Sequence, residues 1–405
     1  MMKRLLIIGN GMACARLLQE LHADGPCGFR ITVVGDEPVA AYNRILLSRL
    51  LGREIEPAAL ALFAPGWTEQ HEVEMITGQP VCSLDPAAGI ATLGDGKQLR
   101  FDKLVFATGA QPVIPDIPGI IGPQVHTFRS WHDCDVLQQY GDAGREIVIA
   151  GGGLLGIEAA CGLAALGAKV TVVHSGAWPL NRQLDGTAGA LLANALRQRG
   201  IHLLLSQRCA QVQRDSDGNI SGVILQDGRS LRAEALVCAI GIRPCDQLAQ
   251  QAGLAVDHGI CVNGWMQSAV EGIHALGECA RVSGENVGLM EPVNQQAAIL
   301  ADVLQGRSPE PWQPAATPTR LKVTGEEVFS AGIMTDPDAD ELVLNDPLSG
   351  AYRKLLVKEQ RLIGAVLYGD TRDGNWYHNM IMEQTPVQGV RQQLLFGQVA
   401  CESAA

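Results

Sequence analysis

The sequence predicts an α/β fold in which two strand–helix–strand units of one design are followed by a small α+β domain. Two observations carry this expectation. An apolar strand, a glycine-rich turn, a helix and a second apolar strand follow one another twice in the chain. The composition then changes at residues 305–318, where Pro, Gly and small residues predict a linker before strand-like runs resume.

The overall composition is that of an ordinary globular chain. Its 405 residues suggest two or three domains, and 47% hydrophobic residues suffice for a core in each. The net charge is -12, and no run of Lys and Arg forms the footprint of a nucleic-acid binder. No stretch is apolar for the length of a membrane span, and residues 1–9 lack the features of a signal peptide. We therefore expect a cytoplasmic protein whose partners are neither nucleic acid nor membrane.

The spacing of the cysteines predicts that two kinds of site are absent. The chain has 11 of them, scattered singly between Cys14 and Cys401, which predicts reduced and mostly buried thiols. None forms a C-x-x-C or C-x-x-x-x-C pair, and neither the cysteines nor the nine His residues have the spacing of metal ligands. The sequence thus predicts no metal site and no redox-active cysteine pair.

The first unit contains a glycine turn. It comprises a strand (3–8), the turn (9–14, GNGMAC), a helix and a second strand (29–34). In a G-x-G-x-x-G turn the glycines let the backbone approach a pyrophosphate, which binds free N–H groups at the helix N-terminus. Gly9 and Gly11 fit this pattern, but Cys14 occupies the place of the third Gly or Ala. Alone, such a turn leaves an ordinary tight β-to-α connection as the alternative.

The second unit repeats this order with a complete motif. It comprises a strand (146–150), the turn (151–156, GGGLLG), a helix and a second strand (168–173). Gly151, Gly153 and Gly156 are all in place, and Glu158 follows just inside the helix. Two copies in register predict two Rossmann-like domains, each with a dinucleotide site.

The residue that ends each second strand bears on which nucleotide binds. Asp36 and Glu37 follow the first, as expected for recognition of an adenosine ribose. His174 follows the second, in place of the usual acid of NAD sites, and Arg182 lies a few residues further on. The choice between NADH and NADPH therefore stays open, as does the alternative that His174 is a solvated loop residue.

At this point the sequence resembles a known family, the FAD-dependent pyridine nucleotide oxidoreductases. The resemblance lies in the order of the two glycine turns with residues 107–109 (ATG), 239–241 (AIG) and 276–280 (LGECA). It implies a glutathione-reductase-like fold in which the first turn holds FAD and an inserted unit holds NAD(P)H. Gly277-Glu278 would return to the flavin, with Glu where the family has Asp; a surface-loop acid is the alternative.

The resemblance also implies domain boundaries. Residues 1–112 and 240–310 would form a discontinuous FAD-binding domain, and residues 113–239 the inserted NAD(P)H-binding domain. Residues 319–400 would form a C-terminal domain, which we expect to serve as an interface or docking surface.

Four further motifs narrow the resemblance. They are residues 42–44 (YNR), 47–49 (LSR), 178–185 (WPLNRQLD) and 368–371 (YGDT). They are similar to the N-terminal reductase part of NAD(P)H nitrite reductase large subunits and to the electron-transfer flavoprotein subunits of assimilatory nitrate reductases, over essentially the whole chain. Nitrite reductase large subunits continue into cysteine-rich iron–sulfur and siroheme segments, whereas this chain ends at Ala405. We therefore expect that it does not itself reduce nitrite.

The family pattern also implies roles for single residues. Asp36 would meet the FAD adenosine ribose, and Val81 the adenine through its backbone. Arg49 would lie near the flavin, where relatives carry Lys, and Arg129 would approach FAD from the crossover. Each is alternatively a surface ion-pair or core residue. The predicted cofactor-binding residues are Gly9, Gly11, Met12, Ala13, Asp36, Glu37, Arg44, Arg49, Val81, Ala107, Thr108, Gly109, Arg129, Gly151, Gly153, Leu155, Gly156, Glu158, His174, Gly241, Gly277 and Glu278.

The implied activity is hydride transfer from NADH to FAD. The cofactors carry this chemistry, so no catalytic side chain is required. Without a redox-active cysteine pair, we expect the electrons to leave to a partner redox protein, the catalytic subunit of assimilatory nitrate reductase. Two alternatives are a reductase for a carrier such as rubredoxin or flavorubredoxin, and a non-catalytic flavin-binding redox sensor. The acceptor, the oligomeric state and the role of the C-terminal domain are left open by the residues.

Overall fold

The structure is a computed structural model that describes residues 2–315, 318–323 and 325–403. By their internal contacts these residues form two compact units. Unit 1 comprises residues 1–47, 56–111 and 242–315, and unit 2 comprises residues 48–55, 112–241 and 316–405. The division into three domains stays a prediction.

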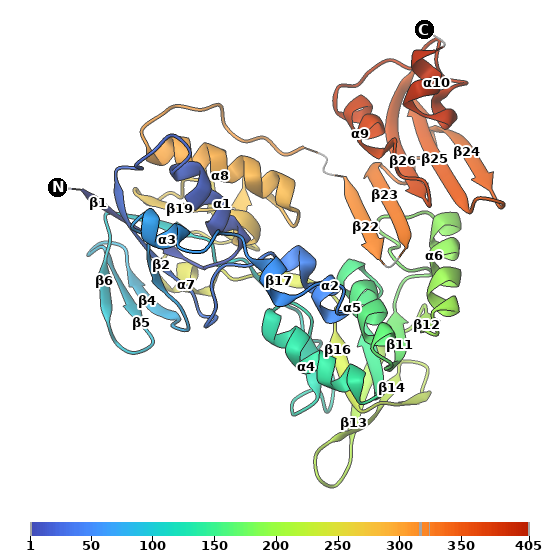
Figure 1. Ribbon diagram of the computed structural model, residues 1–405, viewed down its shortest axis with the longest axis horizontal. Coiled ribbons are helices and arrows are strands. Elements are labelled where there is room, and N and C mark those ends of the chain that lie inside the picture. Colours follow the sequence, from blue (N-terminus) through green and yellow to red (C-terminus); the bar gives the residue numbers. More distant parts are fainter. Residues whose placement is uncertain (1, 316–317, 324, 404–405) are drawn as a thin grey trace. The chain divides into compact units, whose positions relative to one another are not determined.

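Unit 1 is built on a five-stranded parallel sheet in the order β19-β7-β1-β2-β3. Its strands are β1 (Lys3–Ile8), β2 (Phe29–Val34), β3 (Glu74–Ile76), β7 (Lys103–Phe106) and β19 (Ile273–Ala275). Parallel strands need crossover connections, and the first of these is helix α1 (Met12–Leu21). α1 packs beside helix α8 (Met290–Leu304), as Figure 1 shows.

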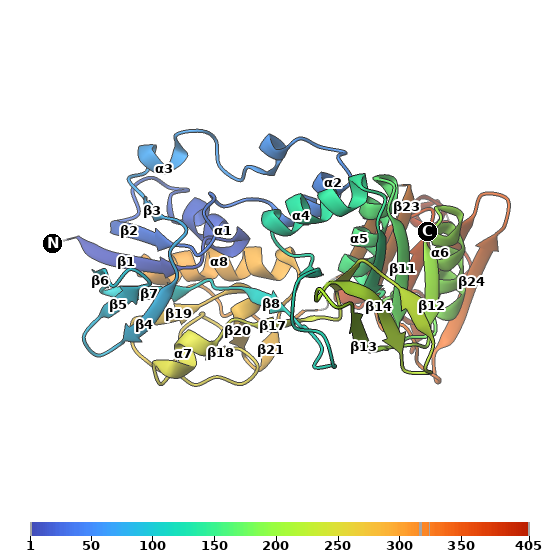
Figure 2. The same ribbon diagram turned by 90° about the horizontal axis from the view of Figure 1, so that it is seen from below.

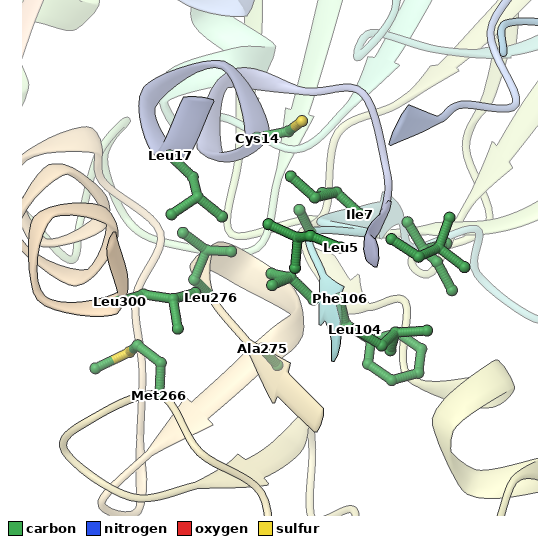
Figure 3. Close-up of a cluster of buried hydrophobic side chains, with 14 of the residues drawn as sticks. Leu5, Ile7, Cys14, Leu17, Leu104, Phe106, Met266, Ala275, Leu276 and Leu300 are labelled. Carbon is green, nitrogen blue, oxygen red and sulfur yellow. The ribbon is translucent and has the colours of Figure 1, made fainter. Parts of the chain in front are cut away.

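The core of unit 1 lies between this sheet and its helices. Leu5 and Ile7 of β1, Leu17 of α1 and Leu300 of α8 are buried and belong to one cluster (Figure 3). The near-continuous apolar run of β1 is what a parallel strand covered on both faces requires.

Smaller elements complete unit 1 (Figure 2). Its further strands are β4 (Val81–Asp85), β5 (Ile90–Leu93), β6 (Gln98–Arg100), β8 (Ala110–Pro112), β17 (Ile242–Pro244), β18 (Ile260–Val262), β20 (Ala280–Val282) and β21 (Glu285–Asn286). Its short helices are η1 (Arg44–Leu46), η2 (Pro57–Leu60), α3 (Trp67–Gln70), α7 (Gln247–Gln251) and η3 (Gly277–Cys279). Strands β4, β5 and β6 pair in an antiparallel sheet.

Unit 2 repeats the parallel design with the strand order β12-β11-β10-β16-β9. The strands are β9 (Val125–Thr127), β10 (Glu146–Ala150), β11 (Lys169–His174), β12 (His202–Leu205) and β16 (Ala235–Cys238). The helices are α2 (Leu47–Leu51), α4 (Trp131–Asp142), α5 (Leu154–Ala165) and α6 (Gly186–Gln198), and an antiparallel sheet is formed by β13 (Cys209–Arg214), β14 (Ile220–Leu225) and β15 (Ser230–Arg232). The predicted α/β architecture with two units of one design is confirmed.

The last part of unit 2 is a five-stranded antiparallel sheet in the order β22-β23-β26-β25-β24. Its strands are β22 (Thr319–Val323), β23 (Glu326–Gly332), β24 (Asp340–Asp346), β25 (Ala351–Lys358) and β26 (Arg361–Tyr368), and they are followed by α9 (Gly374–Met382), η4 (Leu394–Phe396) and α10 (Gln398–Glu402). We call these elements the C-terminal sheet and its helices. Helix α9 packs against β23 and β26 (Figure 1). Of the predicted linker, residues 316 and 317 lie outside the described residues.

Candidate functional site

The first glycine turn joins β1 to α1 at the carboxyl end of the parallel sheet. Gly9 has φ +108°, and a Cβ added there would lie 2.2 Å from the carbonyl oxygen of Ala107. Its N–H donates to the Val34 carbonyl at 2.8 Å. Gly9 is therefore required both by its backbone conformation and by the close approach of the segment that follows β7.

Gly11 presents a different case. Its φ of -106° and ψ of -167° are open to any residue, and an added Cβ would meet none of the described atoms within 4 Å. Gly11 is also the N-cap of α1, where no described side chain caps the helix. Apart from the general preference for glycine over alanine at an N-cap, the described residues thus give no reason for glycine here. A pyrophosphate group that approaches the first-turn N–H groups supplies one, so the turn fits the FAD that the family resemblance implies.

The residues after β2 gather beside the start of α1. Glu37 accepts a hydrogen bond from the Tyr42 hydroxyl at 2.7 Å and forms an ion pair with Arg44. The backbone N–H of Arg44 donates to the Met12 sulfur at 3.3 Å. Asp36 is exposed at the end of the strand. The predicted residues Asp36, Glu37, Arg44 and Met12 are therefore brought to one edge of the sheet.

The late Gly-Glu motif reaches the same edge. Gly277 has φ +76°, and an added Cβ would lie 3.0 Å from the Cβ of Ala13 in α1. Its N–H donates to the side-chain oxygen of Gln296 at 2.9 Å. Glu278 is half-buried beside it. The structure thus brings Gly277 and Ala13 into contact distance, although they lie far apart in the sequence.

Two polar residues at this edge were missed by sequence reasoning. Gln296 is fully buried, and its side-chain nitrogen has no hydrogen-bond partner among the described residues. The same holds for the side-chain oxygen of Asn10, whose nitrogen donates to the Val39 carbonyl at 3.1 Å. Buried polar atoms are normally paired, so these two atoms fit a bound polar ligand. The sequence did contain one signal for Gln296, since it lies between Val293 and Leu300 in the apolar stripe of α8, where a polar residue indicates a buried polar group.

The segment after β7 is fixed by hydrogen bonds within unit 1. The Thr108 hydroxyl donates to the Cys245 carbonyl at 2.7 Å, and the N–H of Cys245 donates to the Gly109 carbonyl at 2.9 Å. Val81 begins β4 and is half-buried. The roles of Ala107, Thr108, Gly109 and Val81 in holding FAD remain predictions.

The second glycine turn reproduces the first. Gly151 has φ +113°, and an added Cβ would lie 2.2 Å from the Ala239 carbonyl oxygen. Gly153, the N-cap of α5, has φ -81° and open space around an added Cβ among the described atoms. An added Cβ at Gly156 would lie 2.0 Å from the Gly151 carbonyl oxygen. The sharp turn at the first glycine and the open space at the second therefore recur at the site predicted for NAD(P)H, and Gly156 adds close helix packing.

Cys14 takes the position that corresponds to Gly156. It is fully buried in the core of unit 1 (Figure 3), and burial raises the pKa of its thiol to about 12. The thiol therefore stays neutral and packs as a small apolar side chain. The departure from the glycine pattern is thus accommodated by the packing of α1.

His174 is the last residue of β11 and is half-buried. Its Nδ1 accepts a hydrogen bond from the N–H of Gly152 at 3.1 Å, and its Nε2 lies 3.0 Å from the side-chain oxygen of Asn181. Burial lowers the pKa of His174. The alternative of a solvated loop residue is therefore wrong, because the imidazole lies against the glycine turn itself. Arg182 is exposed in the loop that follows.

Glu158 is a half-buried acid in helix α5. Burial raises the pKa of its carboxyl group to about 7. Leu155, in the first turn of the same helix, keeps 38% of its surface exposed. At neutral pH the helix therefore presents an apolar side chain and a carboxyl group that is only partly ionised.

Arg49 and Arg129 both belong to unit 2. Arg49 forms an ion pair with Glu54 at 3.4 Å. The backbone N–H of Arg129 donates to Asp133 at 2.8 Å, next to the capping box that starts α4. Gly241, with φ +139°, ends the inserted segment of the same unit. Their contacts with a cofactor remain predictions.

Two further observations concern the described residues only. The eleven cysteines are free, and no cluster of three or more His, Cys, Asp or Glu side chains is arranged to hold a metal ion. None of the helices in the described ranges is long and apolar enough to span a membrane.

Known proteins are similar to this sequence over most of its length. The chain is 35% identical to the nitrite reductase [NAD(P)H] and to the assimilatory nitrate reductase electron transfer subunit of Bacillus subtilis, over 95% and 97% of its residues. It spans about half of these two relatives, 48% and 51% of their lengths. It is 32% identical to the ferredoxin–NAD(+) reductase subunit of a benzene 1,2-dioxygenase system of Pseudomonas putida, over 96% of this chain and 94% of that one.

A solved structure and two family matches complete the comparison. The fold matches that of the covalent putidaredoxin reductase–putidaredoxin complex with a TM-score of 0.87 and 23% identity, over 99% of both chains. Residues 318–385 match the rubredoxin NAD+ reductase C-terminal domain. Residues 3–316 match the pyridine nucleotide-disulphide oxidoreductases, which use FAD and NAD(P)H. The chain therefore belongs to the pyridine nucleotide-disulphide oxidoreductase family.

Proposed function

We propose that this chain takes a hydride from NAD(P)H into FAD and passes the electrons to the catalytic subunit of an assimilatory nitrate reductase. The observation that carries the proposal is the identity of 35% with an assimilatory nitrate reductase electron transfer subunit over 97% of this chain.

In this proposal the glycine turn of unit 1 holds the FAD pyrophosphate. The first-turn N–H groups of α1 bind the phosphates, and Gly11 leaves the space that they occupy. Asn10 and Gln296 supply the two unpaired buried atoms to the polar groups of the cofactor. When bound, FAD supplies the chemistry that nicotinamide lacks, since it accepts a hydride and releases two electrons one at a time.

The glycine turn of unit 2 holds the nicotinamide dinucleotide in the same way. Gly153 leaves the corresponding space at the start of α5. His174 holds the turn through Gly152 and contributes no carboxylate at the ribose position. A 2′-phosphate therefore meets no negative charge from this residue, and we propose that both NADH and NADPH are bound.

The C-terminal domain is proposed as the docking surface for the partner. A second acceptor is favoured by a specific observation, the match of residues 318–385 to the C-terminal domain of rubredoxin NAD+ reductases. The second candidate function is thus the reduction of a rubredoxin-type carrier, by the same flavin chemistry.

The test compares electron acceptors. NADH oxidation by the purified holoprotein is measured with a nitrate reductase catalytic subunit, with rubredoxin and with ferricyanide. The leading proposal predicts saturation at low concentrations of the nitrate reductase subunit and only weak activity with rubredoxin. The reverse preference would support the carrier reductase, and reduction of ferricyanide alone would contradict both acceptors.

A further inference from the structure

Helix α6 is hydrogen-bonded to the C-terminal sheet through its N-cap residue. Asp185 is the N-cap of α6, and its Oδ1 accepts a hydrogen bond from the N–H of Ala188 at 3.1 Å. Its Oδ2 accepts a second hydrogen bond from the hydroxyl of Tyr352 in β25 at 2.6 Å. The ammonium group of Lys354 lies 3.9 Å from the same oxygen and 2.5 Å from Glu341. One carboxylate therefore joins the helix to strand β25.

These groups are almost completely removed from water. Tyr352 is 3% exposed, and the side chains of Asp185 and Lys354 are 11% and 8% exposed. A buried carboxylate that loses one of its partners carries a desolvation cost that the remaining partners do not offset. The position of Asp185 is thus set by the C-terminal sheet as much as by its own helix.

Asp185 also ends the loop that contacts the second glycine turn. This loop, residues 175–185, begins after His174 and is bonded to the turn at Leu180, whose N–H donates to the Gly152 carbonyl at 2.9 Å. Asn181 lies 3.0 Å from the imidazole of His174. Leu180 is buried and has φ +55°, a conformation that a leucine keeps only where its surroundings hold it. The loop therefore has the glycine turn at one end and the C-terminal sheet at the other.

We propose that Tyr352 and Lys354 are positioning residues for NAD(P)H, because they hold the loop that carries Asn181 and Leu180 against the glycine turn through Asp185. This inference rests on the proposed function of unit 2 as the NAD(P)H site. It assigns to the C-terminal sheet a role in nucleotide binding, in addition to the proposed docking of a partner. The effect is indirect, since neither residue is proposed to touch the nucleotide.

The other end of α6 offers a matched control. Arg199, which follows the helix, pairs with Glu326 of β23 at 3.1 Å, and the Tyr368 hydroxyl donates to the same carboxylate. Tyr368 is 6% exposed and thus as buried as Tyr352. Tyr368 is the register partner of Tyr352 on the neighbouring strand β26, but its hydroxyl bonds to Glu326, which pairs with the residue that follows α6 and not with Asp185 at the N-cap. Loss of the Tyr368 hydroxyl therefore removes a comparable bond that does not bear on the nucleotide loop.

The experiment compares Tyr352→Phe with Tyr368→Phe in the holoprotein. The dissociation constant of NAD⁺ is measured by calorimetry, and KM and kcat for NADH are measured with ferricyanide, which needs no docking. We expect Tyr352→Phe to raise the dissociation constant and KM about three- to ten-fold with kcat almost unchanged, because one hydrogen bond to a charged group is lost. Tyr368→Phe should leave all three constants unchanged. The Asp185→Asn/Tyr352→Phe double variant should bind NAD⁺ no less tightly than the single variant that has the lower affinity, because both substitutions act on the same contact and Asn keeps the helix cap.

Two results would overturn the inference. Unchanged nucleotide affinity in Tyr352→Phe would show that the contact is only structural, as would an equal loss in Tyr352→Phe and Tyr368→Phe. A wild-type holoprotein that neither binds NAD⁺ nor is reduced by NADH would overturn the proposed function of unit 2 and this inference with it. The wild-type titration thus separates the two failures.

Discussion

The Nδ1 atom of His174 accepts a hydrogen bond from the backbone N–H of Gly152, 3.1 Å away. Because this nitrogen accepts, the ring hydrogen lies on Nε2, which donates to the side-chain oxygen of Asn181 at 3.0 Å. Burial also lowers the pKa of His174, which favours this neutral form. The strand end at which related sites carry an acid is therefore neutral in this protein.

The first prediction concerns the choice of nucleotide. His174→Glu places a carboxylate at the strand end, where it accepts from ribose hydroxyls and repels a 2′-phosphate. We expect the ratio of kcat/KM for NADH over NADPH to rise about tenfold or more, by the loss of roughly 1.4 kcal/mol of NADPH binding. His174→Gln is the control, because it removes the imidazole without adding a charge. An equal ratio in the Glu and Gln variants would contradict the assignment of this position.

The second prediction uses the paired glycines of the first turn. Gly9→Ala should lower the free energy of unfolding by at least about 2 kcal/mol, since φ +108° and the Ala107 carbonyl both oppose a side chain. Gly11→Ala should change it by about 1 kcal/mol or less, because an added Cβ meets none of the described atoms and only the preference for glycine over alanine at an N-cap is lost. Yet Gly11→Ala should lose bound FAD. Urea denaturation of the apoproteins and the flavin content after purification check this, and Gly11→Ala with full FAD affinity would refute it.

The third prediction concerns Glu158 and pH. Its pKa is raised to about 7 by burial, above the value of an unfolded chain, so the folded protein binds the extra proton between these values. The free energy of unfolding therefore falls as the pH rises through this window, by at most about 3 kcal/mol. Glu158→Gln should abolish this part of the pH dependence and be more stable than wild type at pH about 8 but not at pH about 4. The exposed Glu271 serves as control, since Glu271→Gln should follow the wild-type pH profile of denaturation.

The fourth prediction concerns the ion pair between the buried Arg353 of β25 and Asp373, the N-cap of α9. Arg353 is 7% exposed and donates to Asp373 at 3.0 Å, to the Tyr377 hydroxyl at 2.8 Å and to the Leu395 carbonyl at 2.9 Å. Arg353→Met leaves the Asp373 carboxylate without this partner, and we expect a loss of about 3 kcal/mol or more. Arg372, whose side chain is 87% exposed in its pair with Asp370, is the matched control. Arg372→Met should change the midpoint of urea denaturation little, and equal effects of both variants would contradict the distinction.

The glycine turns were predictable from the sequence because the backbone at their first positions admits only glycine. Positive φ and a carbonyl oxygen 2.2 Å from an added Cβ exclude every other residue at Gly9 and Gly151, so the motif can be recognised in the sequence. The apolar runs that became β1 and β10 were equally visible, since strands covered on both faces admit few polar residues.

The contacts between distant segments could not be predicted in the same way. Gln296 meets Gly277, and Tyr352 meets Asp185, only because the fold brings these segments together. Neither pair has a fixed spacing in the sequence, and a buried Gln or Tyr looks like any polar residue of a helix or strand. The orientation of His174 was likewise open, since a histidine at a strand end can face water or the turn.

Hydride transfer from NADH to FAD is tested most directly by anaerobic mixing of the purified holoprotein with one equivalent of NADH, followed by stopped-flow absorbance. It is run on the wild type and on Gly153→Ala, in which the added Cβ fills only the space assigned to the nicotinamide dinucleotide. We expect the flavin band of the wild type to bleach as NADH is consumed, and Gly153→Ala to keep its FAD but to bleach much more slowly at the same NADH concentration. A wild-type flavin band that stays unchanged in NADH, or a Gly153→Ala variant that bleaches as fast as wild type, would contradict it.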